Sequence, residues 1–348
     1  MRIRKWAAVA AASAMLLAAC GTDDAEPEAT DDVTDTEEEA DDADDEAEAA
    51  DEEWPDEIIL GLVPSQEVDQ LVEDAQVLGD LLEAELGISI DTFVPTDYTA
   101  LVVAMQTGQA HVGMFGPIAL VQAADQAGAN VTLQSVRRGS SSYHTQWFTN
   151  ADNADRFCLD DVVQAENPEG NTFSYCNGTD SAEAGPVGED ALANIEEGET
   201  VHFVDAGSAS GYYYPATQIQ TVAGIDPVDG IDGQFAGSHQ ATVQNVQRGD
   251  AAVGVSFDDA RNDLVEEDPN VGEDVIVFAW SEEIPNDGVA IAGDLPQSLQ
   301  DAITQAFLDI IETEDGGQAF FDVYSIEGLV PADLEALDVA RQVEANFG

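Results

Sequence analysis

The sequence predicts an α/β protein whose folded part consists of two similar lobes, each a mainly parallel sheet flanked by helices. Three observations support this fold class. Residues 58–348 are long enough to form two lobes of ordinary size. Segments with the apolar period of strands alternate with segments that have the period of helices, which indicates parallel sheets. The third observation is an internal repeat, which relates one half of this region to the other.

The repeat joins residues 98–117 to residues 239–258 at a constant offset of 141 positions, without a gap. Each copy predicts a short amphipathic helix that ends at a glycine, followed by a short strand of small residues. A chance match, or a helix–turn–strand pattern common to many proteins, remains an alternative because glycine and alanine are frequent here. The identical pairs are Ala100/Ala241, Val102/Val243, Gln106/Gln247, Gly108/Gly249, Ala110/Ala251, Val112/Val253 and Gly113/Gly254.

The segments before each copy extend the repeat into two strand–helix–strand–helix–strand units. In the first half, leucines such as Leu78 and Leu82 fall on one face of the first helix, and Gly87 ends it. In the second half, Pro215 fits the first turn of the corresponding helix. The expected segments are a strand at 58–63, a helix at 69–86 and a strand at 88–94, and then a strand at 200–204, a turn at 207–211, a helix at 213–223 and a strand at 233–236.

Several polar turns are expected to meet at one cleft, because ligands of parallel sheets lie beyond the carboxyl ends of the strands, where helix N-termini converge. The turn at 207–211 is the strongest candidate, since it has two hydroxyls and the unpaired N–H groups of a helix start, which favour an oxyanion. An ordinary serine-capped helix is the alternative. The residues placed at the cleft are Ser65, Gln66, Tyr98, Phe115, Gly116, Ser208, Ala209, Ser210, Gly211, Ser238, His239, Phe257 and Asp258.

The N-terminal region predicts export and lipid anchoring. Residues 1–20 combine a basic start, a short apolar run and a Leu-Ala-Ala-Cys sequence typical of a bacterial lipobox, so Cys20 is expected to be the lipidated N-terminus of an extracytoplasmic surface protein. A cysteine that follows a signal peptide by chance is the alternative. Residues 21–57 contain 21 acidic and no basic side chains, which predicts a disordered tether. A specific acidic binding tail is the other interpretation.

The charge of the chain excludes one class of partner. The formal net charge is −63, and residues 58–348 hold six arginines, no lysine and 51 acidic side chains. Nucleic-acid binding needs clustered cations, so a nucleic-acid partner is not expected. So many acidic side chains repel one another, and this repulsion is weaker where salt screens it. We therefore interpret the composition as an adaptation to a salty exterior. No segment has the long apolar run of a membrane helix, so the lipid anchor is the only expected membrane contact.

Two cysteines, Cys158 and Cys176, lie in a stretch rich in loop-forming residues. Outside the membrane they are expected to pair, which would stabilise this insertion by roughly 3 kcal/mol. Two cysteines without neighbouring histidines do not predict a metal site.

Seven short segments follow one another along the chain: VPSQ, FVPTDYTA, MFGP, YHTQWFTN, FVDAGSASGYYYP, GSHQATVQNVQRGDAAVG and IPNDGVAIA. In this order they resemble the phosphate/phosphite/phosphonate-binding proteins of ABC importers, over residues 58–337. The resemblance implies a type II periplasmic-binding-protein fold, with two crossing hinge segments between the lobes. Lobe one would comprise residues 58–150 and 285–348, and lobe two residues 151–284. Helices at 299–313 and 334–345 would pack on lobe one.

The resemblance also implies a set of ligand-binding residues. Asp258 would accept a hydrogen bond from a protonated ligand oxygen or a ligand ammonium. Each of these residues has an alternative role. Asp258 would be a solvated aspartate at a strand end, and His239 would only begin a helix. Tyr98 and Tyr143 would pack at the interface between the lobes. The main set is Tyr98, Tyr143, Ser208, Ala209, Ser210, Gly211, His239 and Asp258. The additional candidates are Ser65, Gln66, Phe115, Gly116, Tyr212, Ser238 and Gln240.

Two residues depart from the pattern of the family. Ala209 stands where threonine is common, and Gln240 stands where relatives often have an acidic residue. The second departure disfavours an amine-bearing ligand, so phosphite, methylphosphonate or phosphate is expected ahead of aminoethylphosphonate. The expected donors are hydroxyls and backbone N–H groups, without lysine or arginine. The insertion around Cys158 and Cys176 has no counterpart in the pattern.

The expected function is therefore that of a monomeric solute-binding lipoprotein that delivers a small phosphorus oxyanion to an ABC permease and its ATPase, with no cofactor, metal or catalytic residue. An enzyme is not expected, because a G-x-S-x-G elbow would need serine at Ala209, and no P-loop or H-E-x-x-H motif is present. The alternatives are a sulfonate-type or other small ligand, a hydrolase that uses the Ser208–Ser210 turn, and a purely structural surface lipoprotein.

Overall fold

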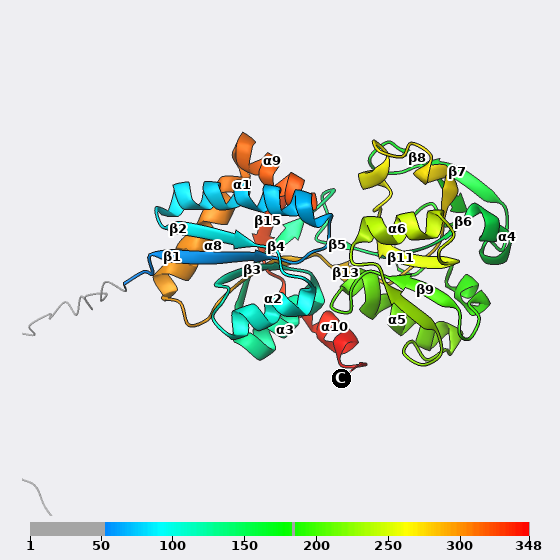
Figure 1. The fold of residues 1–348 in the computed structure, drawn as a ribbon, viewed down its shortest axis with the longest axis horizontal. Helices are drawn as coiled ribbons and strands as arrows, with labels where there is room; N and C mark the ends of the chain where they lie inside the picture. The colour runs from blue at the N-terminus through cyan, green and yellow to red at the C-terminus, as the bar shows by residue number, and fades with distance from the viewer. Residues whose placement is uncertain (1–52, 183–184, 348) are drawn as a thin grey trace, which may run out of the picture. The chain divides into compact units, whose positions relative to one another are not determined.

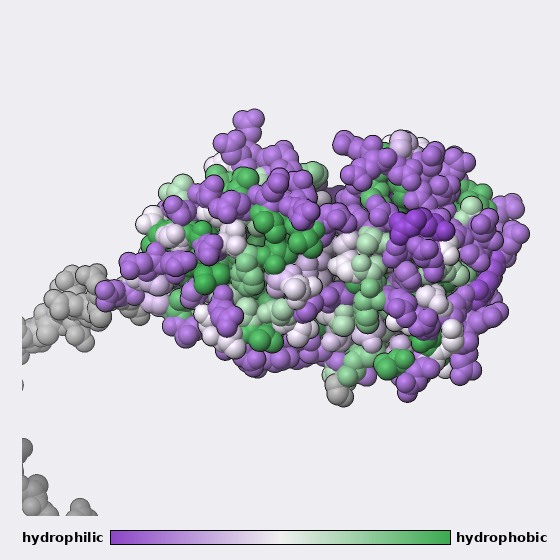
Figure 2. Space-filling model, viewed as in Figure 1, coloured by the Kyte–Doolittle hydropathy of each residue, from purple (hydrophilic) through white to green (hydrophobic). Residues whose placement is uncertain are grey.

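The structure, a computed structural model, describes residues 53–182 and 185–347. The expected export signal with Cys20, and the acidic tether as far as residue 52, lie outside these ranges. Within them, no helix is both long enough and apolar enough to cross a membrane. Hydrophilic residues cover much of the face shown in Figure 2, in keeping with the charge of the sequence.

Lobe one is built on a six-stranded sheet with the order β15-β4-β14-β3-β1-β2 (Figure 1). β1 pairs in parallel with β2 and β3, whereas β14 comes from much later in the chain and lies antiparallel between β3 and β4. The strands are β1 (Glu57–Leu62), β2 (Ser89–Phe93), β3 (Val112–Phe115), β4 (Asn130–Val136), β14 (Gly288–Ile291) and β15 (Gly328–Pro331).

The helices of lobe one bury their apolar faces in one continuous core with this sheet. Leu78, Leu101 and Phe307 are fully buried in it. The C-terminal helices share the same core through residues such as Leu299 and Leu337, so the end of the chain belongs to lobe one. The helices are α1 (Val68–Leu86), α2 (Tyr98–Gln106), α3 (Pro117–Ala127), α8 (Gln297–Ile311), α9 (Glu314–Tyr324) and α10 (Leu334–Glu344).

Lobe two is built on a seven-stranded sheet with the order β10-β9-β11-β6-β12-β8-β7. The strands are β6 (Thr145–Asn150), β7 (Val162–Glu166), β8 (Thr172–Cys176), β9 (Thr200–Phe203), β10 (Asp232–Phe235), β11 (Val253–Phe257) and β12 (Val275–Trp280). Its α-helices are α4 (Ala154–Phe157), α5 (Tyr214–Gln218), α6 (His239–Gln247) and α7 (Val271–Asp274), and π-helical turns at Ala209–Tyr213 and Ile219–Ala223 flank α5.

The internal repeat is visible in both lobes. α2 corresponds to α6 and β3 to β11, and the strand order β2-β1-β3 recurs as β10-β9-β11. Asp97 and Ser238 cap the two helices in the same way, because each side chain accepts a hydrogen bond from the backbone N–H three residues later. Gly108 and Gly249 follow the helices with φ of 70° and 79°, a conformation that favours glycine.

The first crossing between the lobes lies earlier than expected. β6 pairs with β11 and β12, so residues 145–150 belong to lobe two, not to lobe one as the expected boundary at residue 150 required. The chain crosses at β5 (Ser142–Tyr143), which pairs antiparallel with the returning segment β13 (Ile284–Pro285). β6 is buried along its whole length, and a strand of this kind fits the middle of either sheet, so its sequence alone does not identify its partner.

The insertion forms the outer edge of the second sheet. β7 and β8 make an antiparallel hairpin there, and a disulfide joins Cys158, after α4, to Cys176, the last residue of β8. The hairpin is thus tied to the lobe at its base, while its turn at 167–171 extends away from that base.

A buried ion pair holds the centre of lobe two. The side chains of Arg261 and Asp259 are 1% and 4% exposed, and Arg261 donates from Nε and Nη2 to both carboxylate oxygens at 2.9 and 2.6 Å. Its Nη1 donates to the carbonyls of Ser174 and Val275, and its guanidinium lies 4.5 Å from the ring centre of Phe173. One side chain therefore connects two strands and the segment after β11.

We predict that Arg261→Met lowers the free energy of unfolding by about 3–5 kcal/mol, because it leaves the buried Asp259 carboxylate without its counter-charge. Arg248→Met is the matched control. Its ion pair with Asp250 is more than half exposed, and such pairs contribute at most about 1 kcal/mol. Urea unfolding of both variants measures the difference. An equal loss of unfolding free energy in the two variants would contradict the stabilising role of the Arg261–Asp259 pair.

Candidate ligand-binding site

A cavity of about 540 Å³ is lined by both lobes and by the crossing segments. Its walls come from the loops after β1, β3 and β4, the N-terminal ends of α2 and α6, and the ends of β11 and α9. These are the carboxyl ends of strands and the starts of helices, where a parallel sheet places its ligands.

Most of the sequence-predicted site residues are brought together here. The cavity is lined by Ser65, Gln66, Tyr98, Gly116, Tyr143, Ser208, Ala209, Ser210, Phe257, His239 and Asp258. They come from positions far apart in the chain and are assembled by the two-lobed fold.

Five predicted residues do not line the cavity: Phe115, Gly211, Tyr212, Ser238 and Gln240. Phe115 is fully buried in the core of lobe one, and Tyr212 packs against Phe203 and Phe347. Gly211 and Ser238 serve helix caps, while the side-chain amide of Gln240 donates to Asp263. Sequence position placed them near the site, but their side chains or N–H groups are committed to the scaffold.

The Ser208–Ser210 turn begins the π-helical turn of lobe two. Both serines are 2% exposed, and the Ser208 hydroxyl oxygen accepts a hydrogen bond from the Gly211 N–H at 3.0 Å. Because the first N–H groups of a helix lack acceptors within the helix, the N–H groups at Ala209 and Ser210 are suited to an anion.

Gly207 lets the two lobes meet closely beside this turn. A Cβ at this position would lie 2.6 Å from the Cβ of Tyr98, the first residue of α2 in the other lobe. Only a glycine fits this contact without a shift of the neighbouring atoms.

The two tyrosines retain their protons. Burial raises the pKa of Tyr98 well above its usual value, and the carboxylate of Asp205 raises it further, while a hydrogen bond with Ser208 opposes the shift. Burial likewise raises the pKa of Tyr143, and the Asp287 carboxylate adds to it. Both hydroxyls are therefore available as donors at neutral pH.

His239, at the start of α6, is a neutral donor. Burial lowers the pKa of its ring to about 3, and the nearby Arg137 contributes to the shift. The backbone N–H of Phe257 donates to Nδ1 at 3.3 Å, and Ser256 Oγ lies 2.8 Å from the same atom. Since Nδ1 accepts, the single proton of the neutral ring lies on Nε2, which becomes the donor.

Asp258 follows β11 and contributes an acceptor. Burial raises the pKa of its carboxyl to about 6, although Arg138 and His144 act in the opposite direction. Within the described ranges its buried Oδ1 has no hydrogen-bond partner, and Arg138 Nη2 lies 3.9 Å away. A donor on a ligand would satisfy this oxygen.

Two cationic side chains that the sequence did not indicate, Arg137 and Arg138, also line the cavity. Arg137 donates to both oxygens of Asp287 and to the carbonyl of Tyr324, while Arg138 pairs with Glu169 at 3.2 Å. Six acidic residues line the same cavity, so the arginines leave no net positive charge there. Arg137, Arg138 and Asp287 lie beside the crossing segments, outside the internal repeat. Asp287 belongs to the IPNDGVAIA segment, but the resemblance gave it no role in the site.

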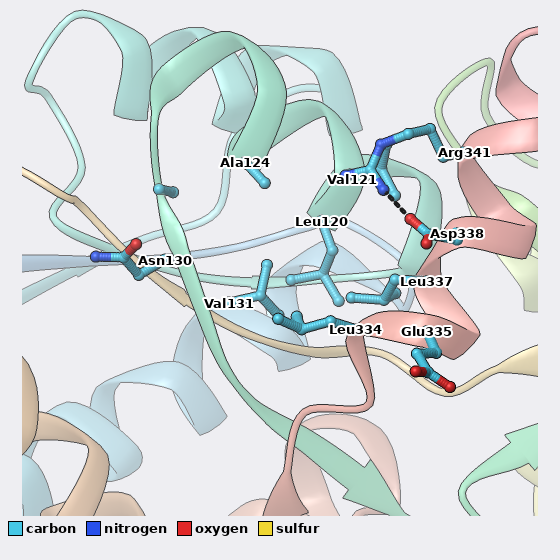
Figure 3. A pocket seen from close by; sticks show the side chains of 11 residues that line it. Leu120, Val121, Ala124, Asn130, Val131, Leu334, Glu335, Leu337, Asp338 and Arg341 are labelled. Carbon is cyan, nitrogen blue, oxygen red and sulfur yellow. Dashed lines mark hydrogen bonds and ion pairs between the residues drawn. The ribbon is translucent and has the colours of Figure 1, made fainter.

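A second hollow, of about 410 Å³, lies in lobe one between α3 and α10 (Figure 3). Leu120, Leu334 and Leu337 surround it, and Arg341 at its rim is paired with Asp338 and Asp125. This apolar surface offers little to an anion. No group of three or more histidine, cysteine or acidic side chains in the described residues is arranged to hold a metal.

Two α/β lobes, two crossing strands and a cavity at the strand ends define a type II periplasmic binding protein. Within this class, the chain belongs to the family of ABC transporter, phosphonate, periplasmic substrate-binding proteins, whose sequence model matches residues 60–337. Membership confirms the resemblance seen in the sequence. It makes the chain an extracytoplasmic substrate-binding protein of a transporter, not an enzyme.

Individual proteins are similar to this chain in sequence or in fold. The phosphate-import protein PhnD of Mycolicibacterium smegmatis is 22% identical over 293 residues, which cover 81% of this chain and 78% of that protein. PhnD1 from Prochlorococcus marinus, solved in complex with methylphosphonate, has a TM-score of 0.68 at 17% identity and covers 84% of this chain and 98% of its own. A phosphonate-transporter binding protein from Pseudomonas aeruginosa has a TM-score of 0.67 at 17% identity, with coverages of 84% and 86%.

We predict that Asp258→Asn stabilises the protein at pH 8 but not at pH 4. The folded-state pKa of about 6 exceeds the ordinary 3.8, so the contribution of the carboxyl is fully present below pH 3.8 and is lost as the pH rises through 6. An asparagine does not pay this cost of burying a charge. Urea unfolding across this range should show the advantage of the variant growing with pH and levelling off above about pH 7.

Asp294→Asn, which changes an exposed carboxyl in lobe one, is the control and should show no such pH dependence. An advantage of Asp258→Asn that is the same at pH 4 and pH 8 would contradict the raised pKa.

Proposed function

We propose that the protein captures a small phosphorus oxyanion in the cavity and delivers it to an ABC permease driven by an ATPase. One observation carries the proposal: neutral donors from both lobes, namely the hydroxyls of Tyr98, Tyr143, Ser208 and Ser210 and the Nε2 of His239, meet in one cavity. Such donors coordinate phosphorus-bound oxygens without a permanent counter-charge, which suits a protein that must release its ligand.

The acceptor Asp258 limits the protonation state of the ligand. A fully ionised oxyanion offers no hydrogen to its buried Oδ1 and would be repelled by the charged carboxylate. A ligand that carries a hydrogen on one oxygen donates to it instead. We therefore propose a hydrogen-bearing monoanion, such as methylphosphonate, phosphite or phosphate. The ligands named for PhnD1 and for the mycobacterial phosphate-import protein belong to this group.

Capture is proposed to proceed by hinge closure. The crossing strands β5 and β13 have only two residues each, so the lobes can rotate about a narrow connection. The donors come from separate lobes, Tyr98 from lobe one and Ser208 with His239 from lobe two. A ligand that contacts all of them favours the closed arrangement, and no covalent step is required.

We further propose that Cys20 anchors the chain to the outer face of the membrane through a lipid and that the acidic tether separates the folded lobes from the bilayer. The composition of the tether supports this role. A monomer is proposed, because one chain supplies all the donors of the site.

We predict that Ser210→Ala weakens the binding of methylphosphonate, phosphite and phosphate about ten- to a hundredfold, since each loses a hydrogen bond to a charged ligand. Titration calorimetry at high salt measures this. Ser89→Ala, on the exposed edge strand β2, is the control and should bind like the parent. A melting assay of the parent should show stabilisation by the bound anion.

Two outcomes would contradict the proposal. If none of the three anions binds to or stabilises the parent, the ligand class is wrong, and a sulfonate tested in the same way would address the nearest alternative. If the anions bind equally well to the parent and to Ser210→Ala, the cavity described here is not their site.

A further inference from the structure

The disulfide-tied insertion contributes a wall of the cavity. Pro168, Glu169 and Asn171, all in the turn between β7 and β8, line it alongside the residues described above. They belong to a segment that neither the repeat nor the family pattern accounts for.

Side-chain hydrogen bonds stabilise the conformation of this turn. The side-chain oxygen of Asn167 accepts hydrogen bonds from the N–H groups of Glu169 and Asn171 at 3.1 and 2.9 Å. The side-chain amides of Asn167 and Asn171 both donate to Oδ1 of Asn262, which lies just after the Asp258–Asp259 segment. The Cys158–Cys176 disulfide fixes the base of the hairpin and the bonds to Asn262 fix its turn, so the hairpin is held at both of its ends.

Glu169 reaches across the boundary between the lobes. Its carboxylate lies 3.2 Å from Nε of Arg138, a residue that follows β4 of lobe one, and about one third of each side chain is exposed. Arg138 also contacts Asp258, so two carboxylates share one guanidinium. Asp263, whose carboxyl accepts from Gln240, adds a third acidic group to this side of the cavity.

The cavity has room beyond the oxyanion. A five-atom tetrahedral anion fills roughly the space of two or three waters, on the order of 100 Å³, whereas the cavity measures about 540 Å³. Pro168, Glu169 and Asn171 line the same cavity as the donors, so a substituent that extends beyond the oxyanion would share this space with the turn of the insertion.

From this arrangement, and resting on the proposed function, we propose that Glu169 is a specificity-determining residue that excludes ligands with a second negative charge. The wall of the insertion admits an uncharged or hydrogen-bond-donating substituent, because Arg138 is already shared by Glu169 and Asp258. A carboxylate on the substituent would meet like charge in a partly desolvated space, where the two arginines of the lining, Arg137 and Arg138, are already paired with carboxylates.

The test compares two ligands that differ by one carboxylate, methylphosphonate and phosphonoacetate, on the parent and on Glu169→Gln. Calorimetry at one fixed salt concentration gives the ratio of their dissociation constants. The parent is expected to prefer methylphosphonate by at least about tenfold, and Glu169→Gln to narrow this ratio by about three- to tenfold. Glu169→Ala should also reduce the ratio of the two dissociation constants.

Glu166→Gln is the matched control, since Glu166 is exposed on the same hairpin and is not among the residues that line the cavity. It should leave the ratio at the parent value. If the parent binds methylphosphonate but Glu169→Gln has the parent ratio, the role of Glu169 is overturned while the proposed function stands. If the parent binds none of methylphosphonate, phosphonoacetate, phosphite and phosphate, the role of Glu169 and the proposed function are both overturned.

Discussion

The ion pair between Arg137 and Asp287 holds together the two segments that enter and leave the crossing between the lobes, and the site depends on this crossing. Arg137 follows β4 and Asp287 precedes β14, so the pair joins the two segments that lead to and from the crossing strands. It places a guanidinium in the cavity and cancels its charge at the same time. The remaining donors can therefore be neutral.

Neutral donors are well matched to a chain of such negative charge. Attraction between an anion and exposed cations weakens as salt screens it, whereas hydrogen bonds from buried hydroxyls and N–H groups depend little on ionic strength. The acidic composition repels anions at long range, whereas hydrogen bonds from Tyr98, His239 and the Ser208–Ser210 turn, the donors in the proposed function, would act only at contact. In that proposal, affinity rests on the geometry that closure of the two lobes supplies.

The sequence predicted site residues best where they lie within the internal repeat. Tyr98 and His239 occupy equivalent positions in the two copies, so both were placed at helix starts facing one cleft, and both line the cavity. Arg137, Asp287 and Glu169 were not foreseen, because they come from crossing segments and an insertion that have no second copy. The lobe assignment of β6 failed for a related reason: a fully buried strand carries no signal of which sheet receives it. Long-range assembly, rather than local pattern, decides these positions.

Gly207 shows how affinity can be set away from the ligand. The absent side chain allows α2 of one lobe to rest on the turn of the other, at a spacing that even a methyl group would disturb. A residue with a Cβ here would collide with Tyr98 and hinder the close approach of the lobes, although every residue that lines the cavity stayed the same. If the proposed closure holds, the residue at this position sets how closely the lobes approach, and with it how long the ligand is retained, although Gly207 is not among the residues that line the cavity.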